Sequence, residues 1–202
     1  IKHDIALYAI HTNFDNVLTG VSAKICAKLG LTQCRILSPK QNVLKKLVTF
    51  CPTSHADQVR EALFKAGAGY IGNYSECSFS THGTGTFKGN ESANPFTGEK
   101  QQQHHEQEVR IETIYPTHTE HLLLKALKEV HPYEEVAFDL YPLANHSPQV
   151  GSGMIGILKD ATEEETFLRH VKTQFSAKVI RHTAFRNKMI HRVAVCGGAG
   201  GF

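Results

Sequence analysis

The chain has 202 residues, of which 41% are hydrophobic and 20% are charged. A chain of this length and composition is typical of a globular protein with one large core or two smaller ones. Its 22 Lys and Arg residues barely exceed its 19 Asp and Glu residues, and a net charge of +3 is too weak to indicate nucleic acid as the main partner.

Membrane and secretion signals are absent from the sequence. No apolar run reaches the roughly 18 residues that a membrane-spanning helix needs, and no signal-peptide pattern opens the chain. The five cysteines are far apart and never form a C-x-x-C pair. Because this pattern is typical of reduced, buried thiols, we expect a cytoplasmic protein. The chain opens on an apolar run and ends in a glycine run, so we expect a segment of a longer protein.

The apolar run at residues 5–10 leads into the first candidate site. Such a run is typical of a strand buried on both faces in an α/β sheet, where the loop after the strand carries functional residues. Here that loop is H-T-N-F-D, from His11 to Asp15. Its imidazole and carboxylate could bind one divalent cation. In the alternative interpretation, His11 is an ordinary strand-end residue and Asp15 caps the next helix.

A short amphipathic helix is expected after this loop. Val21, Ile25 and Leu29 recur at helical spacing, and Gly30 provides a stop. Residues 38–42 are polar and are interpreted as a linker.

The next part of the chain predicts a self-contained module from Lys45 to Leu143. Capping-type sequences at Ser54 and Thr117 predict two helices, and a glycine-rich loop is expected over residues 83–100. Strands are predicted over residues 47–51, 77–81, 109–113 and 136–141. This βαββαβ order is the split βαβ arrangement of ferredoxin-like domains.

The remaining residues return to the first pattern. Strands are predicted over residues 154–158, 178–181 and 192–196, with a helix that a capping box at Thr162 opens. The fold class is therefore α/β, with a discontinuous core interrupted by an inserted ferredoxin-like domain. The predicted boundaries are 1–44 and 150–202 for the core and 45–149 for the insert.

Three motifs occur in order around this module: H-T-N-F-D at residues 11–15, H-P-Y-E-E at 131–135 and V-A-V-C-G-G-A-G-G at 193–201. Together they resemble the dinuclear-metal-centre family named after the NGG-one-interacting factor three, also labelled GTP cyclohydrolase I type 2 homologues, over essentially the whole chain. The resemblance implies two divalent metal ions (Zn, Fe, Mn or Co), an insert similar to PII and CutA, and a toroidal homohexamer whose inserts cap the central cavity.

The resemblance also implies roles for the residues of the first motif. Asp15 would be a metal ligand, the bridging one, and His11 would lie at or beside the metal site. The family's other ligands are an upstream pair of adjacent histidines and a His and a Glu near the carboxyl end, and none has a counterpart here. We therefore do not expect these residues alone to complete a two-metal site.

Two further groups of histidines deserve comparison with that ligand set. His104 and His105 could supply a histidine pair, but they follow three glutamines inside the module, where a polar loop is the simpler interpretation. His131 lies at a predicted helix end that Pro132 terminates, so a structural turn is favoured for residues 131–135. The two glutamates of that motif could face a cavity in an assembly.

The glycine run at residues 197–201 could bind phosphate through backbone N–H groups, but we interpret it first as a tight turn near the metal site. Cys51 and Cys196 are interpreted as core residues rather than nucleophiles. His182 and His191 are expected at the surface.

Three functions remain open. The first is a metal-dependent hydrolase; the family label indicates GTP ring opening, although none of these residues selects guanine. The second is a non-enzymatic regulator or scaffold that binds a small molecule or a partner protein through the PII-like insert. The third is DNA threading through a toroid, which the nearly balanced charge does not favour.

Overall fold

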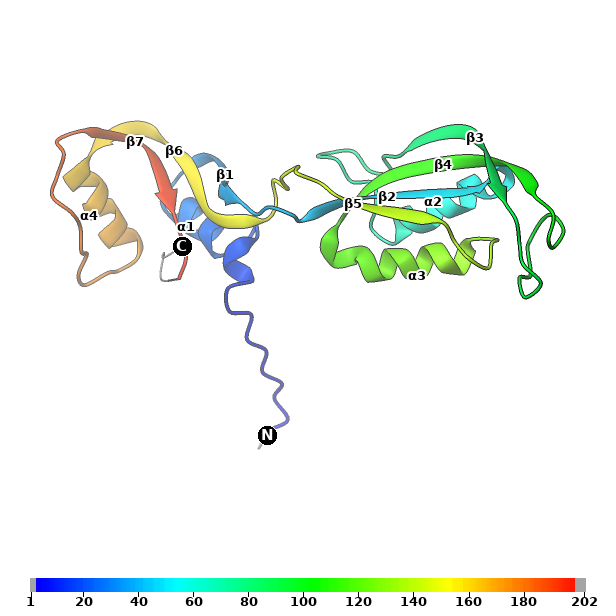
Figure 1. The fold of residues 1–202 in the computed structure, drawn as a ribbon. Coiled ribbons are helices and arrows are strands. Elements are labelled where there is room, and N and C mark those ends of the chain that lie inside the picture. Colours follow the sequence, from blue (N-terminus) through cyan, green and yellow to red (C-terminus); the bar gives the residue numbers. More distant parts are fainter. Residues whose placement is uncertain (1–2, 199–202) are drawn as a thin grey trace. The chain divides into compact units, whose positions relative to one another are not determined.

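The computed structural model describes residues 3–198, which divide into two compact units (Figure 1). Unit 2 is the continuous segment Gln41–His146, and unit 1 is formed by the residues before and after it. The boundaries predicted from the sequence, after residues 44 and 149, lie a few residues beyond the ends of these segments at Lys40 and His146. Within the described range, no helix combines the length and the apolar composition needed to cross a membrane.

Unit 1 is built on a three-stranded antiparallel sheet in the order β1-β6-β7. Its core combines Cys26 and Leu29 with Ile36, Met154 and Val195 from the three strands. The elements in chain order are η1 (Phe14–Asn16), α1 (Val21–Lys28), β1 (Thr32–Pro39), β6 (Gly151–Glu163), α4 (Glu164–Gln174) and β7 (Met189–Val195).

Two predicted strands of unit 1 are wrong. Residues 5–10 form no strand, and Leu7 and Tyr8 are 86% and 87% exposed. Residues 178–181 likewise form no strand, and the Val179 side chain is 77% exposed. An apolar run becomes a strand only where a neighbouring strand accepts and donates its backbone hydrogen bonds, and none of the described strands pairs with either run.

One strand of unit 1 was not expected from the sequence. β1 runs to Pro39 and so includes the beginning of the predicted linker. Only Ile36 of this strand is buried, because the strand lies at an edge of the sheet and pairs with β6 alone. Its apolar pattern is therefore too sparse to indicate a strand.

Unit 2 has the predicted ferredoxin-like topology. Its four strands are antiparallel in the order β3-β4-β2-β5, and helices α2 and α3 pack on one face of this sheet (Figure 1). The fold class expected from the sequence is thus confirmed. The elements are β2 (Leu44–Pro52), η2 (Thr53–His55), α2 (Ala56–Lys65), β3 (Phe79–Phe87), β4 (His104–Pro116), η3 (Thr117–Thr119), α3 (Glu120–Val130) and β5 (Phe138–Pro142).

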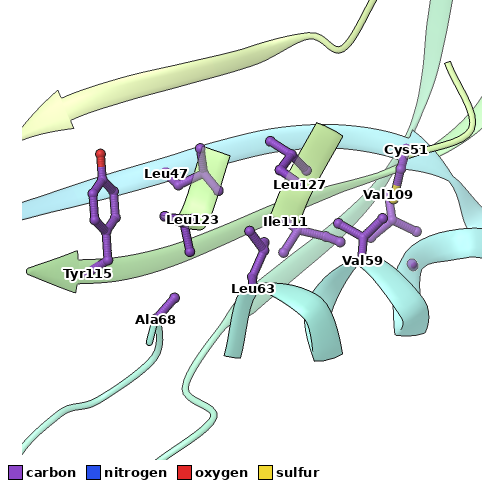
Figure 2. Packing of buried hydrophobic residues seen from close by; sticks show 11 residues of the cluster. Leu47, Cys51, Val59, Leu63, Ala68, Val109, Ile111, Tyr115, Leu123 and Leu127 are labelled. Atoms are coloured by element: carbon purple, nitrogen blue, oxygen red, sulfur yellow. The ribbon is translucent and has the colours of Figure 1, made fainter. Parts of the chain in front are cut away.

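The core of unit 2 lies between the two helices and the sheet (Figure 2). Leu63 of α2 and Leu123 of α3 are fully buried against Ile111 of β4. Strand residues alternate in their direction, so Val109 and Ile111 face this core while Glu108 and Arg110 face away from it. This alternation places charged side chains on the other face of β4.

The ends of several elements in unit 2 differ from expectation. β3 continues to Phe87 and so includes the first part of the predicted glycine-rich loop. α2 and α3 begin from 3₁₀ turns and have no side-chain cap, and α4 of unit 1 also lacks one. Glu120, the expected capping partner of Thr117, instead accepts hydrogen bonds from Lys45 Nζ and Tyr115 Oη, both at 2.7 Å.

Candidate functional site

The H-T-N-F-D loop of unit 1 forms a turn that continues into the 3₁₀ helix η1. The Asp15 N–H donates to the Thr12 carbonyl at 3.2 Å, and the Asn16 amide group donates to the same carbonyl at 3.1 Å. Asn16 Oδ1 accepts a hydrogen bond from Ser152 Oγ at 2.9 Å, which ties the loop to β6. The loop therefore has a defined backbone conformation although it carries no long helix or strand.

Asp15 lies against the turn that follows β7. A Cβ placed on Gly197 would come within 2.8 Å of Asp15 Oδ1, and one on Gly198 would lie 3.5 Å from Oδ2. The Gly197 N–H also donates to Ser22 Oγ of α1 at 3.4 Å. The first and last motifs, distant in the sequence, thus meet beside one carboxylate. Ala199 to Gly201 of the glycine run lie outside the described residues.

The structure excludes the capping role that the alternative interpretation gave to Asp15. Asp15 does not cap α1, because the N-cap residue of that helix is Gly20 and no side chain caps it. The side chain of Asp15 is partly buried, whereas His11 is exposed. Across residues 3–198, no three His, Cys, Asp or Glu side chains are arranged to hold a metal ion.

His131 in the H-P-Y-E-E motif is a structural residue, as favoured by the sequence. Its side chain is 7% exposed, its Nδ1 accepts the Tyr133 N–H at 3.1 Å, and its Nε2 lies 2.9 Å from the Phe50 carbonyl. Because Nδ1 is an acceptor, Nε2 carries the proton and donates to that carbonyl. Burial lowers the pKa of His131 and keeps the ring neutral. Both nitrogens are thus occupied by the fold.

His104 and His105 belong to strand β4 rather than to a loop. Neighbouring residues of a strand point to opposite faces, so the two rings cannot act as a histidine pair on one ion. His104 Nε2 lies 3.1 Å from Glu106 Oε2 and 3.3 Å from Thr97 Oγ1. These contacts fix His104 within unit 2.

Cys51 and the surface histidines agree with the sequence interpretation, whereas Cys196, interpreted as a core residue, belongs to neither core cluster. Cys51 is fully buried, and burial raises the pKa of its thiol to about 11, which disfavours the nucleophilic thiolate. Cys196 is partly buried, and its thiol donates to the Gly197 carbonyl at 3.3 Å. His182 and His191 are exposed.

Unit 2 contains a cavity of about 770 Å³ that sequence reasoning missed. It is bordered by the end of β3, the loop after it, the outward face of β4 and the segment between α3 and β5. Phe87, Phe96 and Tyr133 are aromatic lining residues, and Glu108 is one of several charged ones. A signal was present in the sequence, since the T-H-G-T-G-T pattern places two glycines inside a strand, where close approach by another group is common.

Comparison with known proteins identifies the family. The whole chain, residues 1–202, matches the family model described as Duf34/NIF3 (NGG1p interacting factor 3). The chain belongs to the DUF34/NIF3 family. The resemblance found in the three motifs is thereby confirmed.

Relatives of this DUF34/NIF3 chain carry the name GTP cyclohydrolase 1 type 2 homolog. The one from Halalkalibacterium halodurans is 45% identical and the one from Bacillus subtilis 40% identical, each over 99% of this chain and 54% of the relative. A crystal structure of a Bacillus cereus protein related to NIF3 is 43% identical, with a TM-score of 0.81 over 98% of this chain and 53% of that one. The chain thus spans about half the length of the curated relatives it matches.

Proposed function

We propose that this chain contributes Asp15, with His11 beside it, to the dinuclear metal centre of a metal-dependent hydrolase. The relatives' name, GTP cyclohydrolase 1 type 2 homolog, supports the hydrolase class. The observation that carries the proposal is the meeting of Asp15 with Gly197 and Gly198. The two glycines add no side chain of their own beside the carboxylate, and a carboxylate with imidazole is a ligand set for Zn, Fe, Mn or Co.

The proposal assigns a partial site to the residues described here. Asp15 and His11 are fewer ligands than a resident metal ion needs, so the proposed centre requires further ligands beside these two.

Metal uptake by this chain tests the proposal. We expect weak Zn²⁺ or Co²⁺ binding, measured by calorimetric titration and elemental analysis, that falls by more than about tenfold in Asp15→Ala. Asp160→Ala, which removes an exposed carboxylate from β6 of the same unit, is the matched control and should bind metal as the wild type does. Equal metal binding by Asp15→Ala and the wild type would contradict the assignment.

Turnover is tested with the same variants. We expect that any hydrolysis of GTP by the metal-supplemented chain is lost together with metal uptake in Asp15→Ala. Hydrolysis that persists unchanged in this variant would mean that the activity does not depend on the Asp15 site.

A second candidate function is small-molecule binding by unit 2, in a regulatory role without catalysis. The cavity of about 770 Å³ favours it, because its lining residues all belong to Gln41–His146 and its size suits a small ligand. This function predicts ligand-dependent changes within residues 45–143 that persist in Asp15→Ala. Amide NMR spectra of both proteins, recorded with and without ligand, would show them.

Assembly is part of the proposal. We expect a homo-oligomer, with the hexamer implied by the family resemblance, in the reducing conditions of the cytoplasm. Exposed apolar residues such as Leu7, Tyr8 and Phe79 support self-association, since large exposed apolar groups often mark interfaces. Light scattering over a range of concentrations measures the oligomeric state, and a mass of one chain throughout would contradict it.

A further inference from the structure

We propose that the cavity of unit 2 binds a small organic cation, in which a protonated or quaternary amine is attached to an apolar group. The inference rests on the second candidate function, small-molecule binding by unit 2, and adds the chemical class of the ligand. It is carried by two features that meet in the cavity: aromatic walls and carboxylates.

The aromatic walls are formed around Tyr133. The ring centroid of Tyr133 lies 6.0 Å from that of Phe87 and 6.3 Å from that of Phe96, with the planes tilted by 58° and 48°. Phe96 remains 54% exposed, so an apolar surface of this group is available to a ligand. Aromatic faces attract cations through the ring quadrupole as well as burying apolar groups.

Tyr133 is held in place by the fold on two sides. Its backbone N–H donates to Nδ1 of the buried His131, and its hydroxyl donates to Glu108 Oε1 at 2.8 Å. The Glu108 carboxylate also raises the pKa of Tyr133, after the larger effect of burial, and so keeps the hydroxyl protonated as a donor. The central ring of the wall is therefore ordered before a ligand arrives, which lowers the entropic cost of binding.

The carboxylates give the cavity its charge preference. Glu108, Glu134 and Glu135 line it, and the basic lining residues are Arg110, Lys88 and His82. Arg110 is already paired with Glu112 at 2.9 Å, so three carboxylates face one lysine that the described contacts leave without an acidic partner.

The carboxylate of Glu108 occupies a specific position beside β3. A Cβ on Gly85 would overlap its Oε2, so the absence of a side chain at Gly85 makes room for this group. Glu108 accepts one hydrogen bond, from Tyr133, and Glu134 accepts one from the Asn94 N–H at 2.8 Å. A carboxylate has about four acceptor positions, so both retain capacity for a ligand's N–H donors or positive charge.

This combination distinguishes three kinds of ligand of similar size. A cation gains from both the carboxylates and the aromatic faces. A neutral ligand gains only the apolar contact. It also displaces water from the carboxylates without offering them a positive charge in its place. An anion is repelled by the same carboxylates.

A matched set of probes tests the inference: 2-phenylethylammonium, 2-phenylethanol and 3-phenylpropanoate, each titrated at pH 7 into the whole chain and followed by amide NMR shifts. We expect the cation to bind about threefold to thirtyfold more tightly than the alcohol, and the anion to bind most weakly. The shifts should be centred on residues 81–90 and 131–137.

Three variants assign the interaction to the cavity. Glu135→Gln removes one exposed charge and should weaken the cation about threefold or more, while the alcohol is unaffected. Phe96→Leu keeps an apolar side chain but removes the ring, so it should weaken the cation more than the alcohol. Glu129→Gln, an exposed carboxylate on α3, is the charge-matched control and should change neither affinity.

The outcomes separate the two proposals. Equal binding of all three probes in the cavity would overturn the cation assignment and leave small-molecule binding intact. No shift of a cavity amide with any probe would overturn both. Cation affinity that falls as protein concentration rises would identify a second copy of the chain as the occupant and also overturn the inference.

Discussion

The roles of single residues in this protein depend on the groups that the fold places next to them. His131 lies at a helix end and bonds the nearby Tyr133 N–H. The structure adds a second partner, the Phe50 carbonyl of strand β2. Asp15 likewise meets Gly197, a residue near the other end of the chain. Local sequence indicates that such residues are special, but only the folded chain shows which groups they contact.

The buried His131 gives the stability of unit 2 a pH dependence. Its pKa is lowered below the ordinary value of 6.5 by burial. Between the lowered pKa of the folded state and 6.5, the unfolded chain binds more protons, so the stabilising contribution is present above pH 6.5 and is lost as the pH falls. We expect the free energy of unfolding, measured by urea titration, to decrease below pH 6.5 with a steeper slope in the wild type than in His131→Ala.

The same substitution should destabilise the protein at neutral pH. His131→Ala leaves the Phe50 carbonyl and the Tyr133 N–H without their partner, at a cost of about 1–3 kcal/mol. His121→Ala on the exposed side of α3 is the control, with an expected change within about 0.5 kcal/mol. Equal unfolding midpoints for the two variants would contradict the structural role of His131.

Gly197 provides a test of the Asp15 site that leaves the carboxylate in the chain. In Gly197→Ala, the new methyl group would come within 2.8 Å of Asp15 Oδ1 and 2.9 Å of Val21 Cγ1, so the carboxylate must move. We expect metal uptake to fall as it does in Asp15→Ala. Gly83→Ala, whose methyl group meets nothing within 4 Å, should retain the wild-type uptake in the same titration.

At the scale of helices and strands, the spacing of apolar residues indicates which side of a helix packs into the core. On α3, Leu123 and Leu127 lie four residues apart and are the buried residues of the helix. Capping-type sequences predicted where helices form but not the hydrogen bonds at their starts, since Glu120 pairs with Lys45 and Tyr115 instead of bonding the helix start. A side chain bonds the most favourable partner in the folded chain. The four-residue capping motif cannot show that partner here, because Lys45 lies on β2, far from Glu120 in the sequence.

Adjacent leucines on α3 test this packing. Leu123→Ala removes a fully buried side chain and should lower the free energy of unfolding by about 2–5 kcal/mol. Leu122→Ala removes one that is 57% exposed and should change it by less than about 1 kcal/mol. Urea unfolding monitored by circular dichroism measures both, and similar losses in the two variants would contradict the observed orientation of α3.

At the scale of the whole molecule, the chain consists of two units with separate cores. Unit 2 is continuous, has the ferredoxin-like strand order and contains the entire cavity. Unit 1 depends on segments before and after it, and its Asp15 site joins those two segments. The two proposed functions therefore reside in different units.

The continuous unit should fold by itself. We expect the fragment 41–146 to unfold cooperatively in urea and to give amide shifts that match those of the same residues in the full chain, because every residue of its core cluster lies within the fragment. It should also bind the organic-cation probe with the affinity of the full chain. A fragment without dispersed amide signals would show that unit 2 needs the remaining residues to fold.

The sequence by itself determined the order of the helices and strands in unit 2, the family and the identity of Asp15 as a candidate ligand. These features depend on local periodicity and on motifs that can be read along the chain. Tertiary structure alone decided that residues 5–10 remain unpaired, that β3 extends through its glycines and that Phe87, Phe96 and Glu108 border one cavity. Strand pairing and cavity formation depend on contacts between residues far apart in the chain, which local patterns do not specify.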